Sequence, residues 1–177
     1  MKLKIKDPPE RGSADELQDL SQVVEQYQDR FVPENLQQRC DEDMEGMMFE
    51  YLANRGASID LAKLNEIRKA AIPIIYQLKN YFNRPRPAEV AASYDIPFFG
   101  DYLESAQTPS YPSGHTVQAY VCAGYCAQKY PEHSEGLYMI ANLVSQSRID
   151  RGVHFPSDVE YGIEIAAEII SQLFGGQ

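Results

Sequence analysis

The sequence predicts an all-α protein that folds as a single-domain helical bundle. Apolar residues recur every three or four positions through most of the chain, and capping residues flank these stretches. No pair of strands with alternating apolar residues is visible. Because 177 residues suffice for one domain with a substantial core, we expect one helical domain over residues 1–177. N-terminal helices within 13–56 should pack on a part that spans 79–158.

Capping residues place the first helices. Ser13 and Glu16 form a capping box that opens a helix running to about Arg30. Pro33 suits the start of a second helix, which continues to a stop at Gly56. A third helix is expected over about 58–82, and Pro73 should kink it or break it in two.

Residues 83–112 are rich in proline, and we interpret them as one long ordered loop that includes a helical turn. Long loops are uncommon in compact domains and are often functional. Further helices are expected over about 113–129 and 134–149. The last helix should start near Ser157, where Ser157 and Glu160 form a second capping box, and stop at Gly175 and Gly176.

Composition excludes several classes of protein. The formal net charge of −10 argues against a nucleic-acid partner, which would need a basic surface. No apolar run is long enough to span a bilayer, and the N-terminal MKLKIKDPPERG precedes no apolar stretch of the kind a secretory signal has. We therefore expect a cytoplasmic or otherwise non-secreted protein without a membrane span. The three cysteines do not suggest a disulfide framework, and Cys122 and Cys126 are interpreted as buried thiols.

Three short segments gather the chemically unusual residues. The first, KNYFNRPRP, carries Lys79 and Arg86; the second is PSGH at 112–115; the third, SRIDRGVHFPSD, carries Arg148, His154 and Asp158. Taken singly, each has an ordinary explanation, because charges near helix ends are usually solvated and a serine at a helix start is usually only a cap.

Taken together, the segments fit one task, which is to hold a tetrahedral oxyanion. A helix N-terminus binds phosphate through its unpaired N–H groups, and Gly114 lets an anion approach that backbone closely. Ser113 offers a hydroxyl. Arg86 and Arg148 can each grip two oxygens, and Lys79 adds a point charge.

Two histidines complete this set. Phosphoryl transfer needs an in-line nucleophile and an acid for the leaving oxygen. His154 and Asp158 are four residues apart, a spacing that can place the carboxylate on one ring nitrogen and leave the other free to attack. His115 would then be the acid.

In this order, K-x6-RP (79–87), PSGH (112–115) and SR-x5-H-x3-D (147–158) resemble the three-part signature of the phosphatidic-acid phosphatase type 2 and vanadium haloperoxidase superfamily. SYPSGHT (110–116) further resembles the signature of the bacterial non-specific acid phosphatases, with Pro109 where those usually have glycine. The resemblance covers about Lys79 to Asp158.

The resemblance implies an all-helical phosphatase domain that hydrolyses phosphate monoesters through a phosphohistidine without a metal ion or other cofactor. It makes His154 the nucleophile, Asp158 its orienting partner and His115 the general acid. The phosphate ligands it implies are Lys79, Arg86, Ser113, the Gly114 amide and Arg148. The expected partner is a small, soluble phosphorylated substrate. Arg84 and Arg151 are left as rim or structural charges.

Three alternatives remain open at this point. A vanadium haloperoxidase would use the same ligands, because vanadate mimics the phosphoryl transition state; in a phosphatase vanadate would inhibit. A non-catalytic phosphate-binding module would keep the anion ligands without needing both histidines. A metal site at His115, His154 and Asp158 would be opposed by the nearby cations. The sequence fixes neither the natural substrate nor whether the chain forms a homo-oligomer.

Overall fold

The computed structural model describes residues 3–174, and these contain nine α-helices, two short 3₁₀ helices and no strand. The elements are α1 (Ala14–Gln28), α2 (Glu34–Glu42), α3 (Met44–Ala53), α4 (Leu61–Ala70), α5 (Ile72–Phe82), α6 (Pro87–Ser93), η1 (Glu104–Ala106), α7 (Gly114–Lys129), η2 (Pro131–His133), α8 (Ser134–Asp150) and α9 (Pro156–Phe174). The prediction of an all-α protein is confirmed.

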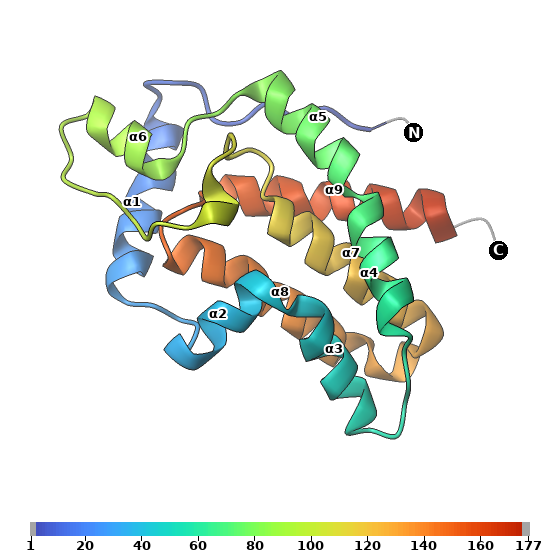
Figure 1. The fold of residues 1–177 in the computed structure, drawn as a ribbon. Coiled ribbons are helices and arrows are strands. Elements are labelled where there is room, and N and C mark those ends of the chain that lie inside the picture. Colours follow the sequence, from blue (N-terminus) through green and yellow to red (C-terminus); the bar gives the residue numbers. More distant parts are fainter. Residues whose placement is uncertain (1–2, 175–177) are drawn as a thin grey trace.

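Helix α7 lies at the centre and packs along both α8 and α9, in the two most extensive helix contacts of the described chain (Figure 1). Its sequence explains this position. Val117, Val121 and Cys122 are fully buried, and they face different neighbours. Gly124 leaves no room for a Cβ against Ile170 of α9, so the two helices approach closely there.

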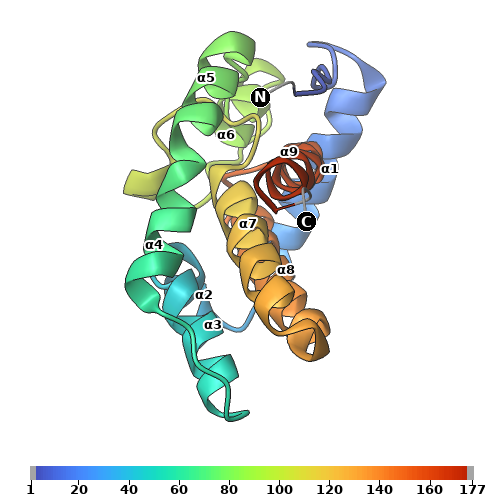
Figure 2. The ribbon, with the colours of Figure 1, turned by 90° about the vertical axis from the view of Figure 1, so that its right-hand side faces the viewer.

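The remaining helices surround this centre, with α4 and α5 on one side and α1 on the other (Figure 2). One apolar cluster joins α2, α3 and α4 to α7 and α8. A second joins α5 to α7 and α9, and a third joins α1 and α6 to the α8–α9 junction. Each cluster therefore fixes outer helices to two of the three central helices, α7, α8 and α9.

Two expected long helices are each divided. The stretch predicted as one helix from 34 to 56 breaks at Asp43, which leaves helical geometry at φ −143° and ψ 41°. Its carboxylate lies over Gly46, where a Cβ would overlap it, and it also pairs with Arg39. This break ends α2 at Glu42, one residue after Asp41. Pro73 acts as expected, since α5 begins directly before it.

Residues 83–112 contain more helix than the one helical turn expected, namely α6 and η1. Pro87 occupies the first position of α6, where a proline is favoured, and this helix has seven residues. The Glu89 carboxylate accepts the backbone N–H of Arg86 at 3.3 Å, which caps the helix and fixes the Arg86 backbone. The expected helix stop at Gly175 and Gly176 lies outside the described residues.

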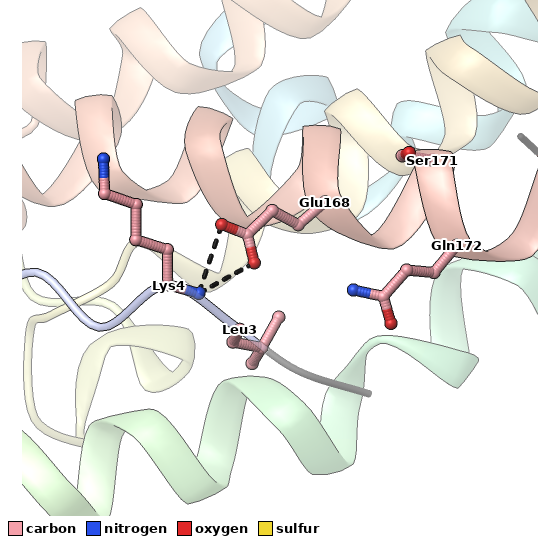
Figure 3. Close-up of a pocket in the computed structure, with 5 residues that line it drawn as sticks. All are labelled: Leu3, Lys4, Glu168, Ser171 and Gln172. Carbon is pink, nitrogen blue, oxygen red and sulfur yellow. Dashed lines mark hydrogen bonds between the residues drawn. The ribbon is translucent and has the colours of Figure 1, made fainter.

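The N-terminal segment lies along α9, as Figure 3 shows. The Lys4 backbone N–H donates to both carboxylate oxygens of Glu168, at 3.2 and 2.9 Å. Lys6 pairs with Glu164 at 2.6 Å. The cavity drawn in Figure 3 is lined by Leu3, Lys4, Glu168, Ser171 and Gln172, none of which belongs to the three sequence motifs.

Leu64 is fully buried where α4 meets α7. We expect Leu64→Ala to lower the free energy of unfolding by about 2–5 kcal/mol, because it removes apolar contacts and leaves a cavity. Leu61→Ala in the same helix is the matched control; this side chain is 42% exposed and should change stability by less than about 0.5 kcal/mol. Urea unfolding followed by circular dichroism measures both. Equal effects would contradict the packing described.

Candidate active site

The structure brings the eight predicted site residues together where α7 and α9 begin and α8 ends. They are Lys79 in the last turn of α5, Arg86 before α6, Ser113, Gly114 and His115 at the start of α7, Arg148 in the last turn of α8, His154 in the α8–α9 connection and Asp158 in the first turn of α9. His154, Arg148 and Asp158 are at most 1% exposed. The cluster is therefore an interior site.

The start of α7 explains why glycine follows serine there. Ser113 caps the helix, and its Oγ accepts the Thr116 hydroxyl at 2.9 Å. A Cβ on Gly114 would lie 3.2 Å from Ile75 and 3.8 Å from the Lys79 Cε. The missing side chain lets the first turn of α7 pack closely on α5, and it places the helix N-terminus beside the Lys79 ammonium group.

A tight turn after α8 positions His154. Gly152 has a φ of +71°, which a glycine adopts without strain, and a Cβ there would lie 2.6 Å from the Phe98 ring. The Arg148 carbonyl then accepts the N–H groups of Val153 and His154, at 3.1 and 3.3 Å. The chain thus folds back over the end of α8, and His154 lies close to Arg148.

The partners of His154 fix its tautomer. Its Nδ1 lies 3.0 Å from the Asp158 Oδ2, and its Nε2 lies 2.9 Å from the Arg86 Nη1. A guanidinium can only donate and a carboxylate can only accept, so Nδ1 carries the proton and Nε2 keeps its lone pair. That lone pair points into the cationic part of the site, which is the state a nucleophilic imidazole needs.

Asp158 also serves as the cap of α9. Its Oδ2 accepts the Phe155 N–H at 2.9 Å, so the expected capping role of Ser157 is wrong. The Ser157 hydroxyl instead donates to Asp19 and accepts from Arg84. The helix starts two residues earlier than the capping box predicts, because Pro156 occupies its first position.

Of the two expected roles for Arg84, a rim charge or a structural charge, its burial favours the second, because the residue is only 3% exposed. Its Nη1 donates to the Asp158 Oδ1 at 2.7 Å, its Nη2 donates to the Asp19 Oδ2 at 2.9 Å, and its guanidinium covers the Phe155 ring at 3.9 Å. Asp19 comes from α1, so the first helix of the chain helps to hold the partner of His154. No spacing in the sequence indicated this contact.

His115 has a partner that the sequence also did not indicate. Its Nε2 lies 3.0 Å from the Asp41 carbonyl oxygen and 3.1 Å from the Asp41 Oδ1. The same Oδ1 accepts from the Arg148 Nη1 and, at 2.8 Å, from the Ser105 hydroxyl. Asp41 stands in an acidic run with no motif around it, so no sequence signal distinguishes it.

Two of the phosphate-binding candidates, Lys79 and Arg86, are cations that within residues 3–174 donate to backbone carbonyls and not to carboxylates. Lys79 donates to the Pro109 carbonyl, and Arg86 donates to the carbonyls of Thr108 and Val153, at 2.8 and 2.6 Å. Within residues 3–174 neither side chain forms a salt bridge. The Arg148 Nε is buried and has no hydrogen-bond partner in the same part of the chain. The site therefore holds more positive charge and more donors than its own acceptors satisfy.

Burial changes the pKa values of these groups. Desolvation, followed by repulsion from Arg86, lowers the pKa of Lys79 to about 7. Burial lowers the pKa of Arg86 to about 10. Burial and then the Arg86 charge hold the pKa of His154 well below 6.5. An anion bound among these groups would raise all three pKa values again. The electrostatics of the site therefore favour an anionic ligand.

Two surface cavities flank the cluster. One, of about 370 Å³, reaches Arg86 and Val153 and is bordered by the exposed rings of Phe99 and Tyr102. The other, of about 390 Å³, reaches Asp41. Its lining is largely charged or amide-bearing and comprises Arg30, Glu34, Gln37, Gln38, Asp41, Glu42, Asp101, Leu103 and Arg151.

Comparison with known proteins places the chain in a family. Residues 67–174 match the family model described as the PAP2 superfamily, and all eight site residues fall within this range. The chain belongs to the PAP2 superfamily. The resemblance stated from the three motifs is thereby confirmed. Asp19 and Asp41 lie outside the matched range, so α1 and α2 add two carboxylates to the PAP2 site.

Two relatives extend this comparison. An acid phosphatase of Zymomonas mobilis is 30% identical over 145 residues, which cover 78% of this chain and 54% of the relative. The chain thus spans about half the length of that curated relative. A transmembrane PAP2-type phosphatidylglycerolphosphate phosphatase from Bacillus subtilis has a similar fold, with a TM-score of 0.60 and 21% identity over 92% of this chain and 86% of that one. In residues 3–174 of this PAP2 protein, every helix is too short or too polar to cross a bilayer.

Sulfate binding should depend on pH through Lys79. Sulfate keeps its charge between pH 6 and 9, and burial lowers the pKa of both site histidines below 6.5. Because the neutral Lys79 amine no longer attracts the anion, the affinity for sulfate should fall by up to about tenfold per pH unit above about 7. Isothermal titration calorimetry measures this dependence.

Two variants separate Lys79 from the rest of the protein. Lys79→Gln should bind sulfate more weakly at pH 6 and show no further loss towards pH 9. Lys63→Gln removes an exposed lysine of α4 and should behave like the wild type. An unchanged pH dependence in Lys79→Gln would show that another group titrates.

Proposed function

We propose that this PAP2 protein hydrolyses phosphate monoesters through a phosphohistidine formed on His154. The observation that carries the proposal is the buried set of cations without carboxylate partners, Lys79 and Arg86, beside an imidazole whose Nε2 lone pair faces them. Arg148 adds a buried Nε that lacks a partner among residues 3–174. Such a site suits three equatorial phosphoryl oxygens and an in-line nucleophile.

The reaction has two steps. In the first, the His154 Nε2 lone pair attacks phosphorus, the ester P–O bond breaks, and His115 gives a proton to the leaving oxygen. In the second, a water molecule gives a proton to His115 and attacks phosphorus, and the P–N bond breaks to release phosphate. Asp158 keeps the proton on Nδ1 of His154 and stabilises the positive ring that forms.

The proposed mechanism needs no metal ion or other cofactor. Lys79, Arg86 and Arg148 supply the positive charge that a metal supplies in other phosphatases. Vanadate, which adopts the geometry of the phosphoryl transition state, should then bind tightly as an inhibitor.

We further propose a small, polar substrate. The burial of His154 and Arg148 leaves little room around the phosphoryl group, and the cavity at Asp41 is lined mainly by charged and amide side chains. The name of the Zymomonas relative agrees with a phosphatase, whereas the Bacillus relative is named for a lipid phosphate. A cytoplasmic or other non-secreted location stays a prediction from the sequence.

Hydrolysis of 4-nitrophenyl phosphate in EDTA tests the reaction. Activity should survive chelation, and His154→Ala should lower kcat by about 10³-fold or more, because the nucleophile is lost. Alkaline quenching of the wild type should trap phosphate on His154, since phosphohistidine is stable in alkali. His133→Ala is the matched control, as this third histidine lies in η2, away from the site.

The outcomes separate the alternatives. Full activity in His154→Ala would exclude the proposed nucleophile. Tight phosphate binding without turnover would indicate a binding module, and halide oxidation with vanadate and peroxide would indicate a haloperoxidase. Comparing kcat/KM for a sugar phosphate and for a diacylglycerol phosphate in micelles tests the substrate class. A preference for the micellar lipid would contradict the small polar substrate and leave the phosphatase reaction intact.

A further inference from the structure

Each histidine of the site has a carboxylate, and the two carboxylates come from different parts of the chain. Asp158 holds the Nδ1 of His154 from the first turn of α9. Asp41 holds the Nε2 of His115 from the last turn of α2, 74 residues away. The first pair lies within the PAP2 match at 67–174, and Asp41 lies outside it.

The Asp41 carboxylate is well fixed. Its helix is anchored by Cys40, which is fully buried in the core, and α2 ends where Asp43 breaks it. Its Oδ1 receives three donors: the His115 Nε2, the Arg148 Nη1 and the Ser105 hydroxyl. A carboxylate with this many donors in a partly buried position has few alternative orientations.

The contacts of Asp41 show which nitrogen atoms of Arg148 and His115 remain available to the substrate. Asp41 and Ser105 take the Nη1 and Nη2 of Arg148, while its Nε is buried and lacks a partner in residues 3–174. Asp41 also occupies the Nε2 side of His115, so Nδ1 is the nitrogen left to meet the leaving oxygen. The contacts of Asp41 with Arg148 and His115 therefore leave the Arg148 Nε and the His115 Nδ1 for the substrate.

We propose that Asp41 is a positioning residue that holds His115 as the general acid, with Nε2–H donated to Asp41 and Nδ1–H directed at the leaving oxygen. This inference rests on the proposed phosphatase reaction. The acid form of His115 carries both protons. When the ester bond breaks, the Nδ1 proton moves to the leaving oxygen, and the neutral ring stays hydrogen-bonded to Asp41 through Nε2–H. Water returns a proton to Nδ1 in the second step.

Charge balance at His115 explains why the acid needs this carboxylate. The titratable groups that act on it are Arg148 from α8, Asp41 from α2 and His154 from the α8–α9 connection. Burial and then Arg148 lower the pKa of His115, and the hydrogen bond and charge of Asp41 oppose both. Without Asp41 the ring would lose its second proton at a lower pH.

The sharpest test compares leaving groups. A poor leaving group, such as an alkyl oxygen, needs protonation as the bond breaks, whereas 4-nitrophenolate leaves with little help. In Asp41→Asn we expect kcat/KM to fall by about 10- to 100-fold for an alkyl phosphate and by only a few fold for 4-nitrophenyl phosphate. The alkaline limb of the kcat profile for the alkyl ester should move to lower pH.

Two controls keep this test specific. Glu50→Gln removes an exposed carboxylate of α3, which pairs with Arg39 and lines neither of the two cavities, and it should leave both substrates unaffected. In the double variant Asp41→Asn/His115→Ala, the rate should match that of His115→Ala alone, because Asp41 then has no acid to position. Circular dichroism and thermal melting confirm that each variant is folded.

Equal losses for the two esters with an unchanged pH profile would overturn the inference and assign Asp41 a purely structural role. A rise in kcat/KM with tighter phosphate inhibition in Asp41→Asn would also overturn the inference. It would show that Asp41 competes with the substrate for Arg148. Both results leave the proposed function standing if His154→Ala remains inactive. Failure to trap phosphate on His154 in the wild type would instead contradict the proposed function.

Discussion

The buried carboxylate of Asp158 joins the separate motifs into one site. It accepts the Phe155 N–H that starts α9, the Nδ1–H of His154 and the Nη1–H of Arg84, and the Ser110 hydroxyl lies 3.4 Å from it. Its backbone carbonyl accepts the Ser113 N–H at 3.0 Å. A buried carboxylate must be fully paired, since losing one partner costs about 3–5 kcal/mol. The positions of α7, α9 and the segment before α6 are therefore coupled.

The N-terminal helices complete this charge balance. The PAP2 part of the chain buries Arg84, Arg86, Arg148 and Lys79 close together, and α1 and α2 contribute Asp19 and Asp41 to two of the arginines. The carboxylates of Asp19 and Asp41 thereby neutralise the charges of Arg84 and Arg148. Arg86 and Lys79 have no such partner within residues 3–174, so the uncompensated charge lies beside the His154 Nε2. This asymmetry leaves one place in the site where an anion is stabilised.

The sequence predicted the helices and the motif residues because both depend on local information. Periodicity gives helices, Pro73 gives a break, and PSGH gives a helix start with room for an anion. The division at Asp43 was missed, because it depends on a side chain folding over Gly46. Arg84, Asp19 and Asp41 were not placed, because their contacts cross 65 residues or more and have no spacing signal. The helix α6 was missed because prolines that suit a helix start also suit a loop.

The central claim is that one tetrahedral anion lies between two imidazoles, each oriented by its own carboxylate. A crystal structure with vanadate bound tests it most directly. We expect vanadium bonded to the Nε2 of His154, equatorial oxygens on Lys79, Arg86 and Arg148, and the opposite apical oxygen within hydrogen-bond distance of the His115 Nδ1. Vanadate bonded to His115, or bound with His154 turned away from Asp158, would contradict the account.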